Sequence, residues 1–276
     1  MYNIGIIGLG VLGSAIFETF KLFPEVEIHC YDKYKNIGSS LEELINTQII
    51  FLCLPTLYDE EAKCFDKKEI YGTCAKLSEL EYKGIVILKS TVEPGTTNEL
   101  VEKYDKLLII HNPEFLSART ATEDFKKQHH IVLGINGTLR AVDSLHNKEV
   151  IVKYLTKFFF RFFPLAEITV CSPLESESMK LFCNAFYATK IQFFTEMKLL
   201  CDNMKIDYDE VVEMMLDNRW INPMHTNVPG PDGEISFGGA CFPKDIKALN
   251  QVMIKNGIPN EVISAVVKER DSMRKS

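Results

Sequence analysis

The sequence has no excess of positive charge and no apolar run long enough to cross a bilayer. Its 31 lysines and arginines are outnumbered by 38 aspartates and glutamates, which gives a formal net charge of -7. Nucleic-acid surfaces need clustered basic side chains to neutralise phosphates, so this balance argues against a nucleic-acid partner. A membrane-spanning helix needs about 20 apolar residues in a row, so we expect no membrane partner either. A local site can still bind a small anion.

The eight cysteines lack the paired spacing of metal sites and disulfide frames. They are scattered, no two form a Cys-x-x-Cys pair, and the chain opens on an apolar strand-like run instead of a secretory leader. This arrangement is typical of reduced thiols in an intracellular protein, and it does not favour zinc. We therefore expect a cytoplasmic protein without a metal.

A glycine-rich turn lies between the first apolar run and the first helical segment. A predicted strand over residues 2–7 is followed by Gly8-Leu9-Gly10-Val11-Leu12-Gly13, and residues 14–22 have helical composition. In dinucleotide-binding proteins the first glycine makes the turn, the second lets the backbone approach the pyrophosphate, and the third lets the helix pack on the strand. The turn, with Val11 and Leu12 inside it, is therefore predicted to bind NAD.

Asp32 ends a second predicted strand over residues 26–31, 19 positions beyond Gly13. Its carboxylate would accept hydrogen bonds from the adenosine ribose hydroxyls and repel a 2′-phosphate, which favours NAD over NADP. Lys33 follows it directly, and we assign it to the same end of the cofactor.

Further apolar runs continue the alternation of strands and helices. Strands are predicted at 48–54, 84–88, 107–110 and 131–134. The alternation is typical of a doubly wound parallel sheet, an α/β Rossmann fold that we place at residues 1–170. Ligands lie outside the carboxyl ends of such strands, which makes candidates of Thr56, Ser90, Thr91 and Glu114. Taken singly, each could equally cap a helix.

One long helix is predicted over residues 173–204. Ser172 and Glu175 form a capping box at its start. Lys180 and Asn184 are four residues apart, hence on one face, and both have apolar neighbours. A buried lysine is costly unless it is paired, so at least one of the two is predicted to lie in an interior, and a functional role is favoured. The rest of the chain, 171–276, is expected to be a smaller all-helical domain.

One cysteine stands in a glycine-rich stretch beside charged side chains. The stretch reads Phe237-Gly238-Gly239-Ala240-Cys241-Phe242-Pro243-Lys244-Asp245. The glycines allow a tight turn and let a ligand approach the main chain, and a neighbouring cation favours the reactive thiolate. A lone cysteine in such a loop is more often a buried structural residue, but the motifs earlier in the chain favour a nucleophile. A long loop that contains Arg219 precedes the stretch.

Five motifs together resemble the UDP-glucose and GDP-mannose dehydrogenase family. They are the glycine turn, Lys89-Ser90-Thr91-Val92, Asn112-Pro113-Glu114-Phe115-Leu116, Lys180 with Asn184, and the Cys241 stretch. They occur in family order and cover nearly the whole chain. The resemblance implies a four-electron, NAD-dependent oxidation of the C6 alcohol of a nucleotide sugar, with UDP-glucose to UDP-glucuronate as the first candidate. Cys241 would form a thiohemiacetal and then a thioester.

The resemblance also implies a role for each matched residue. Asp245, with Lys180 or a water held by Thr91, would help to remove the hydroxyl proton. Lys180 and Asn184 would stabilise oxyanions, and Glu114 with Thr91 would position or deprotonate the hydrolytic water. Lys244 is assigned to the cofactor. The substrate would contact Glu114, Phe115, Leu116, Lys180, Asn184, Arg219, Phe237, Gly238 and Cys241. A homodimer through the helical domain is expected, with Phe182, Phe186, Phe193 and Phe194 as candidates for that contact or for core.

Two features depart from the family. Ala118 stands where many members have a second glutamate, which puts a cofactor or loop contact in doubt. Family members also continue into a third, α/β domain that binds the nucleotide, whereas this sequence ends at Ser276. Three alternatives follow: the protein is a naturally short form, it holds the nucleotide in another way, or its substrate is a smaller hydroxylated sugar.

Two alternatives stay open. A β-hydroxyacid dehydrogenase of the 3-hydroxyisobutyrate type also joins a Rossmann domain to a helical domain with a lysine and an asparagine one turn apart. The chain length suits that group and Lys180 would be the acid/base, but Cys241 and Glu114 would have no purpose there. A catalytically silent NAD-binding relative would explain the missing third domain, although the candidate catalytic residues are intact.

Overall fold

The computed structural model describes residues 1–35, 37–38, 40–136 and 147–274 of the 276-residue chain. The chain forms two compact units. The first comprises Met1–Leu57 and Asp66–Lys180, and the second comprises Tyr58–Phe65 and Leu181–Ser276. A compact unit defined by its internal contacts is not the same as a domain. The predicted domain division near residue 170 therefore stays a prediction.

The described part of the first unit is built on one sheet of eight strands. In spatial order these are β10 (Glu167–Cys171), β9 (His130–Gly134), β8 (Leu108–His111), β7 (Ile85–Leu88), β4 (Ile49–Leu52), β1 (Tyr2–Ile7), β2 (Val26–Asp32) and β3 (Ile37–Gly38). The strands from β8 to β2 are parallel neighbours, whereas β3 is antiparallel to β2 and β9 to β8. The predicted doubly wound, mostly parallel sheet is confirmed.

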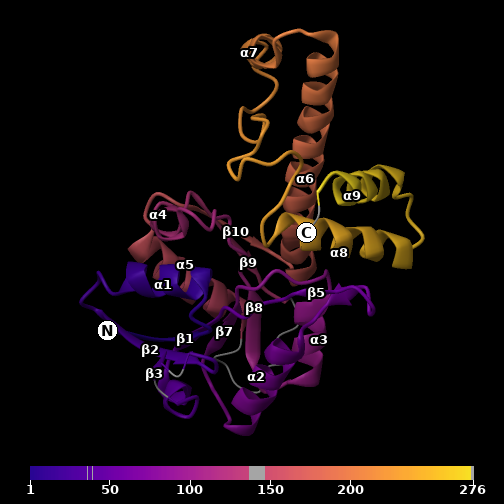
Figure 1. Cartoon of the computed structure of the whole chain (residues 1–276). Coiled ribbons are helices and arrows are strands. Elements are labelled where there is room, and N and C mark those ends of the chain that lie inside the picture. The colour runs from indigo at the N-terminus through magenta and orange to yellow at the C-terminus, as the bar shows by residue number, and fades with distance from the viewer. Residues whose placement is uncertain (36, 39, 137–146, 275–276) are drawn as a thin grey trace. The chain divides into compact units, whose positions relative to one another are not determined.

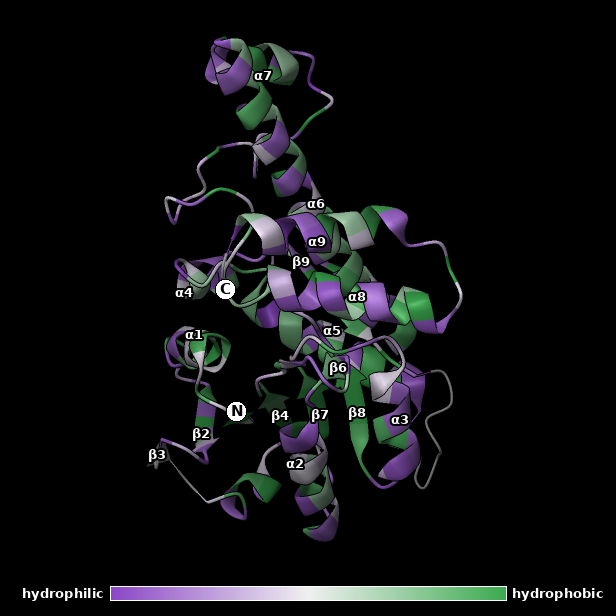
Figure 2. Cartoon of the chain, turned by 45° about the vertical axis from the view of Figure 1, so that its right-hand side comes forward, coloured by the Kyte–Doolittle hydropathy of each residue, from purple (hydrophilic) through white to green (hydrophobic). Residues whose placement is uncertain are grey.

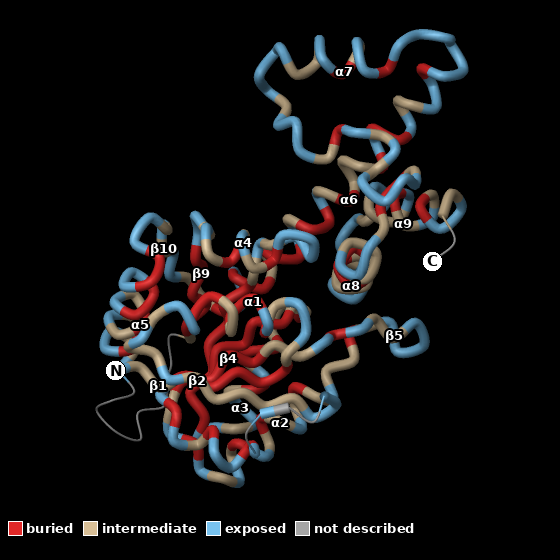
Figure 3. The backbone as a smooth tube through the Cα atoms, turned by 60° about the vertical axis from the view of Figure 1, so that its left-hand side comes forward, coloured by how far each residue is buried: buried red, intermediate tan, exposed pale blue. Residues whose placement is uncertain are grey.

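Helices cover both faces of this sheet (Figure 1). They are α1 (Val11–Phe20), α2 (Lys68–Glu79), α3 (Thr96–Lys103), α4 (Ala121–Lys126) and α5 (Lys148–Phe162), with a 3-10 turn η1 (Glu43–Asn46). Strand side chains alternate between two cores: Ile49 and Phe51 of β4 pack with α1, α4 and α5, whereas Ile50 and Leu52 pack with α2 and α3. Buried on both faces, the central strands are continuously apolar, as Figures 2 and 3 show.

The aromatic run at 158–163 lies at the end of α5 and in the core. Phe158 and Phe162 pack edge-on against Tyr2, with ring centroids 5.3 Å apart in both pairs. The run therefore contributes to the core, because helical spacing turns its buried members toward the sheet.

The second unit contains most of α6 (Pro173–Met204), which begins in the first unit. Its other helices are α7 (Tyr208–Asp217), α8 (Phe242–Lys255) and α9 (Glu261–Met273). The predicted capping box is present, because the Glu175 carboxylate accepts hydrogen bonds from Ser172 N and Oγ, both at 2.7 Å. No helix of the described residues is both long and apolar enough to span a membrane.

A small hairpin of β5 (Tyr58–Asp59) and β6 (Cys64–Phe65) also belongs to the second unit. Phe65 is buried with Leu181 and Ala248. The sequence gives no signal of this hairpin, because two-residue strands are too short to show a periodicity.

Candidate active site

The glycine turn has the geometry that a dinucleotide site requires. Gly8 has φ of 89°, and a Cβ there would lie 2.4 Å from the Cys53 carbonyl oxygen, while a Cβ on Gly13 would lie 1.9 Å from the Gly8 oxygen. No atom lies within 4 Å of a Cβ on Gly10, which is the N-cap of α1. Close packing thus requires two of the glycines, and the third leaves open space at a helix N-terminus, where a pyrophosphate fits.

The Asp32 carboxylate is held by the backbone around it. Oδ2 accepts from Leu9 N at 2.8 Å, and Oδ1 accepts from Tyr34 N and Lys35 N, both at 3.0 Å. Burial alone would raise the pKa of Asp32, but these N–H groups and the Lys35 charge lower it below the ordinary value. An ionised acceptor beside the glycine turn fits the ribose of NAD.

The two lysines near Asp32 differ in their partners. Lys33 pairs with Glu69 at 3.2 Å, so its predicted contact with the cofactor stays a prediction. The Lys35 ammonium instead donates to the Leu9 carbonyl, inside the glycine turn. Sequence reasoning missed Lys35, because nothing in a solvated turn distinguishes one lysine from its neighbour.

The ends of β4 and β7 lie together in the first unit. The Thr56 hydroxyl donates to the Thr91 carbonyl at 2.7 Å, so these two predicted residues are neighbours. The Ser90 hydroxyl donates to Leu54 O at 2.6 Å and accepts from Leu54 N at 3.1 Å. Ser90 therefore ties two strand ends together through backbone bonds.

Glu114 and Lys180 form a shielded ion pair. Lys180 Nζ lies 3.2 Å from Glu114 Oε1, with side-chain exposures of 6% and 14%, and Leu116 N donates to Glu114 Oε2 at 2.7 Å. Lys180 also lies 5.4 Å from the ring centroid of the exposed Phe115. The prediction that Lys180 enters an interior is confirmed, and its partner comes from the post-strand loop singled out in the sequence.

Two buried basic residues beside this pair have no role in the sequence interpretation. Lys89 donates to Asn112 Oδ1 at 2.8 Å and lies 3.4 Å from the Pro113 carbonyl. Burial lowers its pKa to about 8, with Cys53 and Glu114 opposing the shift. His111 Nδ1 lies 2.8 Å from Ser176 Oγ on α6, and burial lowers the pKa of this imidazole to about 3. Lys89 begins one of the family motifs, which is the signal that could have found it.

Asp245 is the centre of a polar cluster in the second unit. Its carboxylate is fully buried. Asn184 Nδ2 donates to Oδ2 at 2.6 Å, and Lys244 Nζ lies 2.6 Å from Oδ1. The Lys244 ammonium also lies 4.4 Å from the ring centroid of Phe65. Residues of two predicted motifs are thus brought together, Asn184 of α6 and the adjacent Lys244 and Asp245, whereas the sequence did not indicate the aromatic ring of the hairpin.

Cys241 is exposed and occupies the N-cap of α8. The helix itself begins at Phe242. A helix N-terminus presents free N–H groups and favours negative charge, which suits a thiolate. Pro243 in the first turn is the sequence signal for this start.

The glycine pair before Cys241 serves two purposes. Gly239 has φ of 77°, whereas a Cβ on Gly238 would lie 2.3 Å from the Arg274 guanidinium. Phe237 is buried in the core of the second unit, and Arg219 is exposed with φ of 63°. Substrate contacts of Phe237, Gly238 and Arg219 stay predictions.

Comparison with known families agrees with these features. Residues 26–148 match the NAD-binding domain of the UDP-glucose/GDP-mannose dehydrogenase family, and residues 174–271 match its central domain. The chain belongs to this family. NAD is the cofactor of the matched N-terminal domain, and the open space at Gly10 and the ionised Asp32 fit it.

Relatives and solved structures extend the comparison. A UDP-glucose 6-dehydrogenase of Rickettsia bellii is 32% identical over 94% of this chain and 58% of its own length. A UDP-glucose dehydrogenase structure from Pyrobaculum islandicum has a TM-score of 0.84 at 24% identity, covering 99% of this chain and 68% of that one. A 3-hydroxyisobutyrate dehydrogenase structure from Mycobacterium tuberculosis has a TM-score of 0.73 at 15% identity, covering 97% and 92%. The chain spans about half the length of the curated relatives it matches.

Proposed function

We propose that the protein oxidises the C6 alcohol of a nucleotide sugar to a carboxylate with NAD, using Cys241 as a nucleophile. The first candidate reaction converts UDP-glucose to UDP-glucuronate, since the similar proteins include UDP-glucose 6-dehydrogenases. The observation that carries the proposal is the place of Cys241, an exposed thiol at the N-cap of α8, four residues before the buried carboxylate of Asp245.

In the first oxidation the chain has to take a proton from the substrate hydroxyl. NAD supplies the hydride acceptor for both oxidations when it is bound. Asp245, with Lys180 or a water held by Thr91, takes the hydroxyl proton. Each Asp245 oxygen accepts one hydrogen bond from Asn184 or Lys244, which leaves acceptor capacity on both for this proton.

In the second oxidation the sulfur of Cys241 forms a bond to C6 of the aldehyde, and the oxidised product is a thioester. The oxyanion needs N–H donors in place before the charge develops. Asn184 donates one amide hydrogen to Asp245 and has a second to offer, and Lys180 has ammonium hydrogens beyond its contact with Glu114.

Hydrolysis completes the reaction. Glu114, with Thr91, deprotonates a water that attacks the thioester carbon, the C–S bond breaks, and the thiol is regenerated. One alcohol, one water and two NAD+ would thus give one carboxylate, two NADH and three protons. Glu114 is suited to this role because Lys180 and Leu116 N each contact one of its oxygens and hold the carboxylate in place.

The test is a panel of UDP- and GDP-sugars supplied with NAD, in which the NADH formed per sugar consumed is counted. We expect two NADH per sugar and a carboxylate product. In Cys241→Ser we expect turnover to fall at least 100-fold and to stop short of two NADH, whereas Cys171→Ser on β10 should behave as wild type. Two NADH per sugar at an unchanged rate in Cys241→Ser would overturn the proposal.

The fold likeness to a 3-hydroxyisobutyrate dehydrogenase, of which the chain covers 92%, favours a second candidate. In a β-hydroxyacid dehydrogenase, Lys180 would be the acid/base and each turnover would release one NADH. Indifference to alkylation of Cys241 would favour this candidate over the first.

A homodimer through α6 is also proposed. Phe182, Phe186 and Phe193 are exposed on this helix, whereas Phe194 is buried with Tyr208 and Val212. Clustered exposed aromatics mark subunit contacts. The molar mass from light scattering should be that of a dimer and should fall toward that of a monomer in Phe186→Ser.

We place the reaction in the cytoplasm. None of the eight cysteines, which all lie within the described residues, forms a disulfide, and this suits a reducing compartment. Thiol labelling of the protein in fresh cell extract should find all of them reduced.

A further inference from the structure

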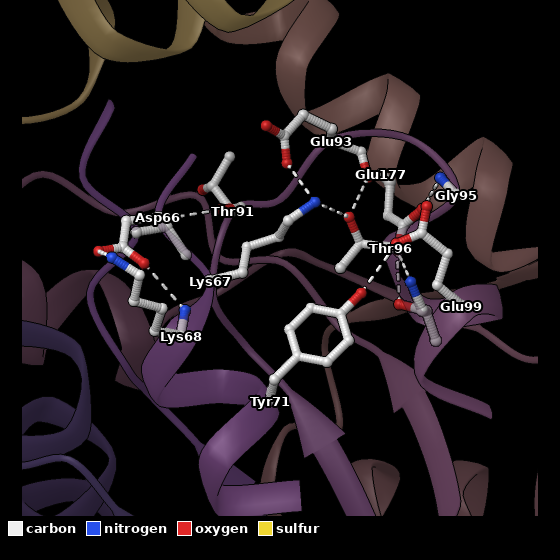
Figure 4. A network of polar contacts seen from close by, with 12 residues as sticks. Asp66, Lys67, Lys68, Tyr71, Thr91, Glu93, Gly95, Thr96, Glu99 and Glu177 are labelled. Atoms are coloured by element: carbon white, nitrogen blue, oxygen red, sulfur yellow. Dashed lines mark hydrogen bonds and ion pairs between the residues drawn. The ribbon is translucent and has the colours of Figure 1, made fainter. Parts of the chain in front are cut away.

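The start of α3 is stabilised by a side chain from another helix. Gly95, at the N-cap of α3, has φ of 102° and no side chain with which to cap the helix. Glu177 of α6, 82 residues along the chain, takes that place: Oε2 accepts from Gly95 N at 2.6 Å, and Oε1 accepts from Thr97 N at 2.7 Å and Thr97 Oγ1 at 2.5 Å. Figure 4 shows the carboxylate at the first turn of α3.

Burial of the Glu177 carboxylate is energetically unfavourable for its charged form. Glu177 is fully buried, and burial raises its pKa more than the hydrogen bonds from Thr97 and Gly95 and the Lys67 charge lower it. A buried charge often adds little to the free energy of unfolding. The presence of Glu177 at this position is better explained by the geometry that it imposes on α3 and α6.

The segment on the α3 side carries one of the predicted catalytic residues. Thr91 lies four residues before Gly95, and its carbonyl accepts from Thr56. Between them, Glu93 pairs with Lys67 at 3.0 Å, and Lys67 lies 3.3 Å from Thr96 Oγ1. Figure 4 shows this network beside Glu177. The segment is therefore fixed along its length, and Glu177 is its connection to α6.

The α6 side carries another predicted catalytic residue. Lys180 lies three residues after Glu177, almost one helical turn, and pairs with Glu114. Ser176, directly before Glu177, contacts the buried His111. Adjacent side chains of α6 thus attach it to α3 and β8, which limits both rotation and sliding of the turn that holds Lys180.

We propose that Glu177 is a positioning residue, which holds Thr91 after β7 and Lys180 on α6 in a constant relation through the N-terminus of α3. The proposal rests on the proposed function for the roles of those two residues. A displacement of about 1 Å at a reacting group can lower a rate about 100-fold, so loss of this connection should reduce turnover without contact between Glu177 and the substrate.

Glu177→Gln is the informative variant. Both carboxylate oxygens accept hydrogen bonds, but an amide has a single acceptor oxygen, so in either orientation its NH2 group faces an N–H donor. The variant therefore keeps the volume and breaks one side of the connection. Thr97→Val is the milder second variant, because it removes only the hydroxyl donor. Glu102→Gln, at an exposed position of α3, is the matched control.

Steady-state kinetics measure the effect on turnover. In Glu177→Gln we expect kcat to fall 10- to 100-fold while the KM for NAD stays within twofold, because the glycine turn and Asp32 do not contact Glu177. Thr97→Val should lose a few-fold in kcat, and Glu102→Gln should equal wild type. A kcat within threefold of wild type in Glu177→Gln, or a parallel loss of NAD binding, would overturn the proposal.

Acetylation of lysines, followed by mass spectrometry, measures position independently of turnover. Lys180 is 5% exposed, and its modification should accelerate several-fold in Glu177→Gln, together with faster amide exchange at Thr96 and Thr97. If the wild type oxidises no nucleotide sugar, the proposed function fails, and this measurement still decides the positioning of Lys180. Unchanged modification and exchange would overturn the proposal.

Discussion

The two compact units stabilise their buried charges in different ways. In the first unit, Lys89, Glu114, Glu177 and Lys180 come from the end of β7, the segment after β8, and α6, and most of their partners are distant in sequence. In the second unit the buried Asp245 has its cation, Lys244, as its direct neighbour in the chain.

The difference shows how each unit depends on the rest of the chain. A carboxylate and an ammonium that are adjacent in sequence need only one local conformation to pair. The first unit brings its charges together only when the sheet has formed. There Lys89 and Glu177 have neutral hydrogen-bond partners. Among the described residues, no carboxylate lies within ion-pair distance of Lys89. We therefore expect the buried charges of the first unit to make its stability depend on pH. In the second unit, stability should depend on whether the partner of the buried charge is present.

The largest expected effect is in the second unit. Asp245→Ala leaves the Lys244 ammonium and the Asn184 amide without their shared acceptor, so we expect a loss of about 3 kcal/mol in the free energy of unfolding. Urea denaturation followed by circular dichroism measures it. Glu60→Gln, which removes the 68% exposed partner of Lys247, should cost less than about 1 kcal/mol. Equal losses in both variants would remove the distinction between buried and surface pairs.

His111 should give the first unit an acid-sensitive stability. Its folded pKa of about 3 lies below the ordinary value of 6.5, so only the unfolded chain takes up this proton, and stability falls as the pH drops through that window. Between pH 6.5 and 4.5, the free energy of unfolding of the wild type should fall by about 2 kcal/mol more than that of His111→Asn. Urea midpoints at both pH values check this, with the exposed His129→Asn as control. Parallel pH profiles of wild type and His111→Asn would contradict the prediction.

Lys89 should make the stability of the first unit depend on pH in the alkaline range. Its folded pKa of about 8 lies below the ordinary value of 10.5, so the unfolded chain holds the proton longer, and stability rises as the pH increases from 8 toward 10.5. Between pH 8 and 9.5, the free energy of unfolding of the wild type should rise by about 1.5 kcal/mol relative to that of Lys89→Met. The exposed Lys83→Met, just before β7, provides the control in the same denaturation series. A constant difference across that range would show that Lys89 is not a buried ammonium.

The smallest expected effect concerns the hairpin in the second unit. Phe65→Leu keeps an apolar side chain beside Leu181 and Ala248 but removes the ring under Lys244, so we expect a loss of about 1 to 2 kcal/mol. Phe17→Leu, where the 45% exposed Lys21 lies 5.7 Å from the ring, should lose less. Thermal unfolding ranks the two variants, and a smaller loss in Phe65→Leu would mean that the cation contributes nothing there.

Several elements could be predicted because their signals are local. The strand over residues 2–7, the glycine turn and the start of α6 at Pro173 match the structure. A glycine turn, a proline and a capping box act through backbone sterics and neighbouring hydrogen bonds, which a sequence displays directly. Thr91, Glu114, Lys180 and Asn184 became candidates for a related reason, because each follows a strand or lies on a defined helix face.

Other features depend on what the folded chain places nearby. Phe193 and Phe194 are adjacent in sequence, yet one is exposed and the other buried. Lys33 and Lys35 belong to one turn, but only Lys35 contacts the glycine loop. Helix rotation and chain direction decide such differences, and neither is encoded in composition or spacing.

By itself the sequence determined the alternation of elements, the cofactor turn and the candidate nucleophile, because these depend on residues within a few positions of one another. The tertiary structure alone decided that Glu177 caps α3, that Lys89 and His111 lie buried beside the Glu114–Lys180 pair, and that a hairpin from the first half of the chain supplies an aromatic ring to Lys244. The physical reason is desolvation. A polar group needs a protein partner only once folding has buried it, and that partner can come from any distance along the chain.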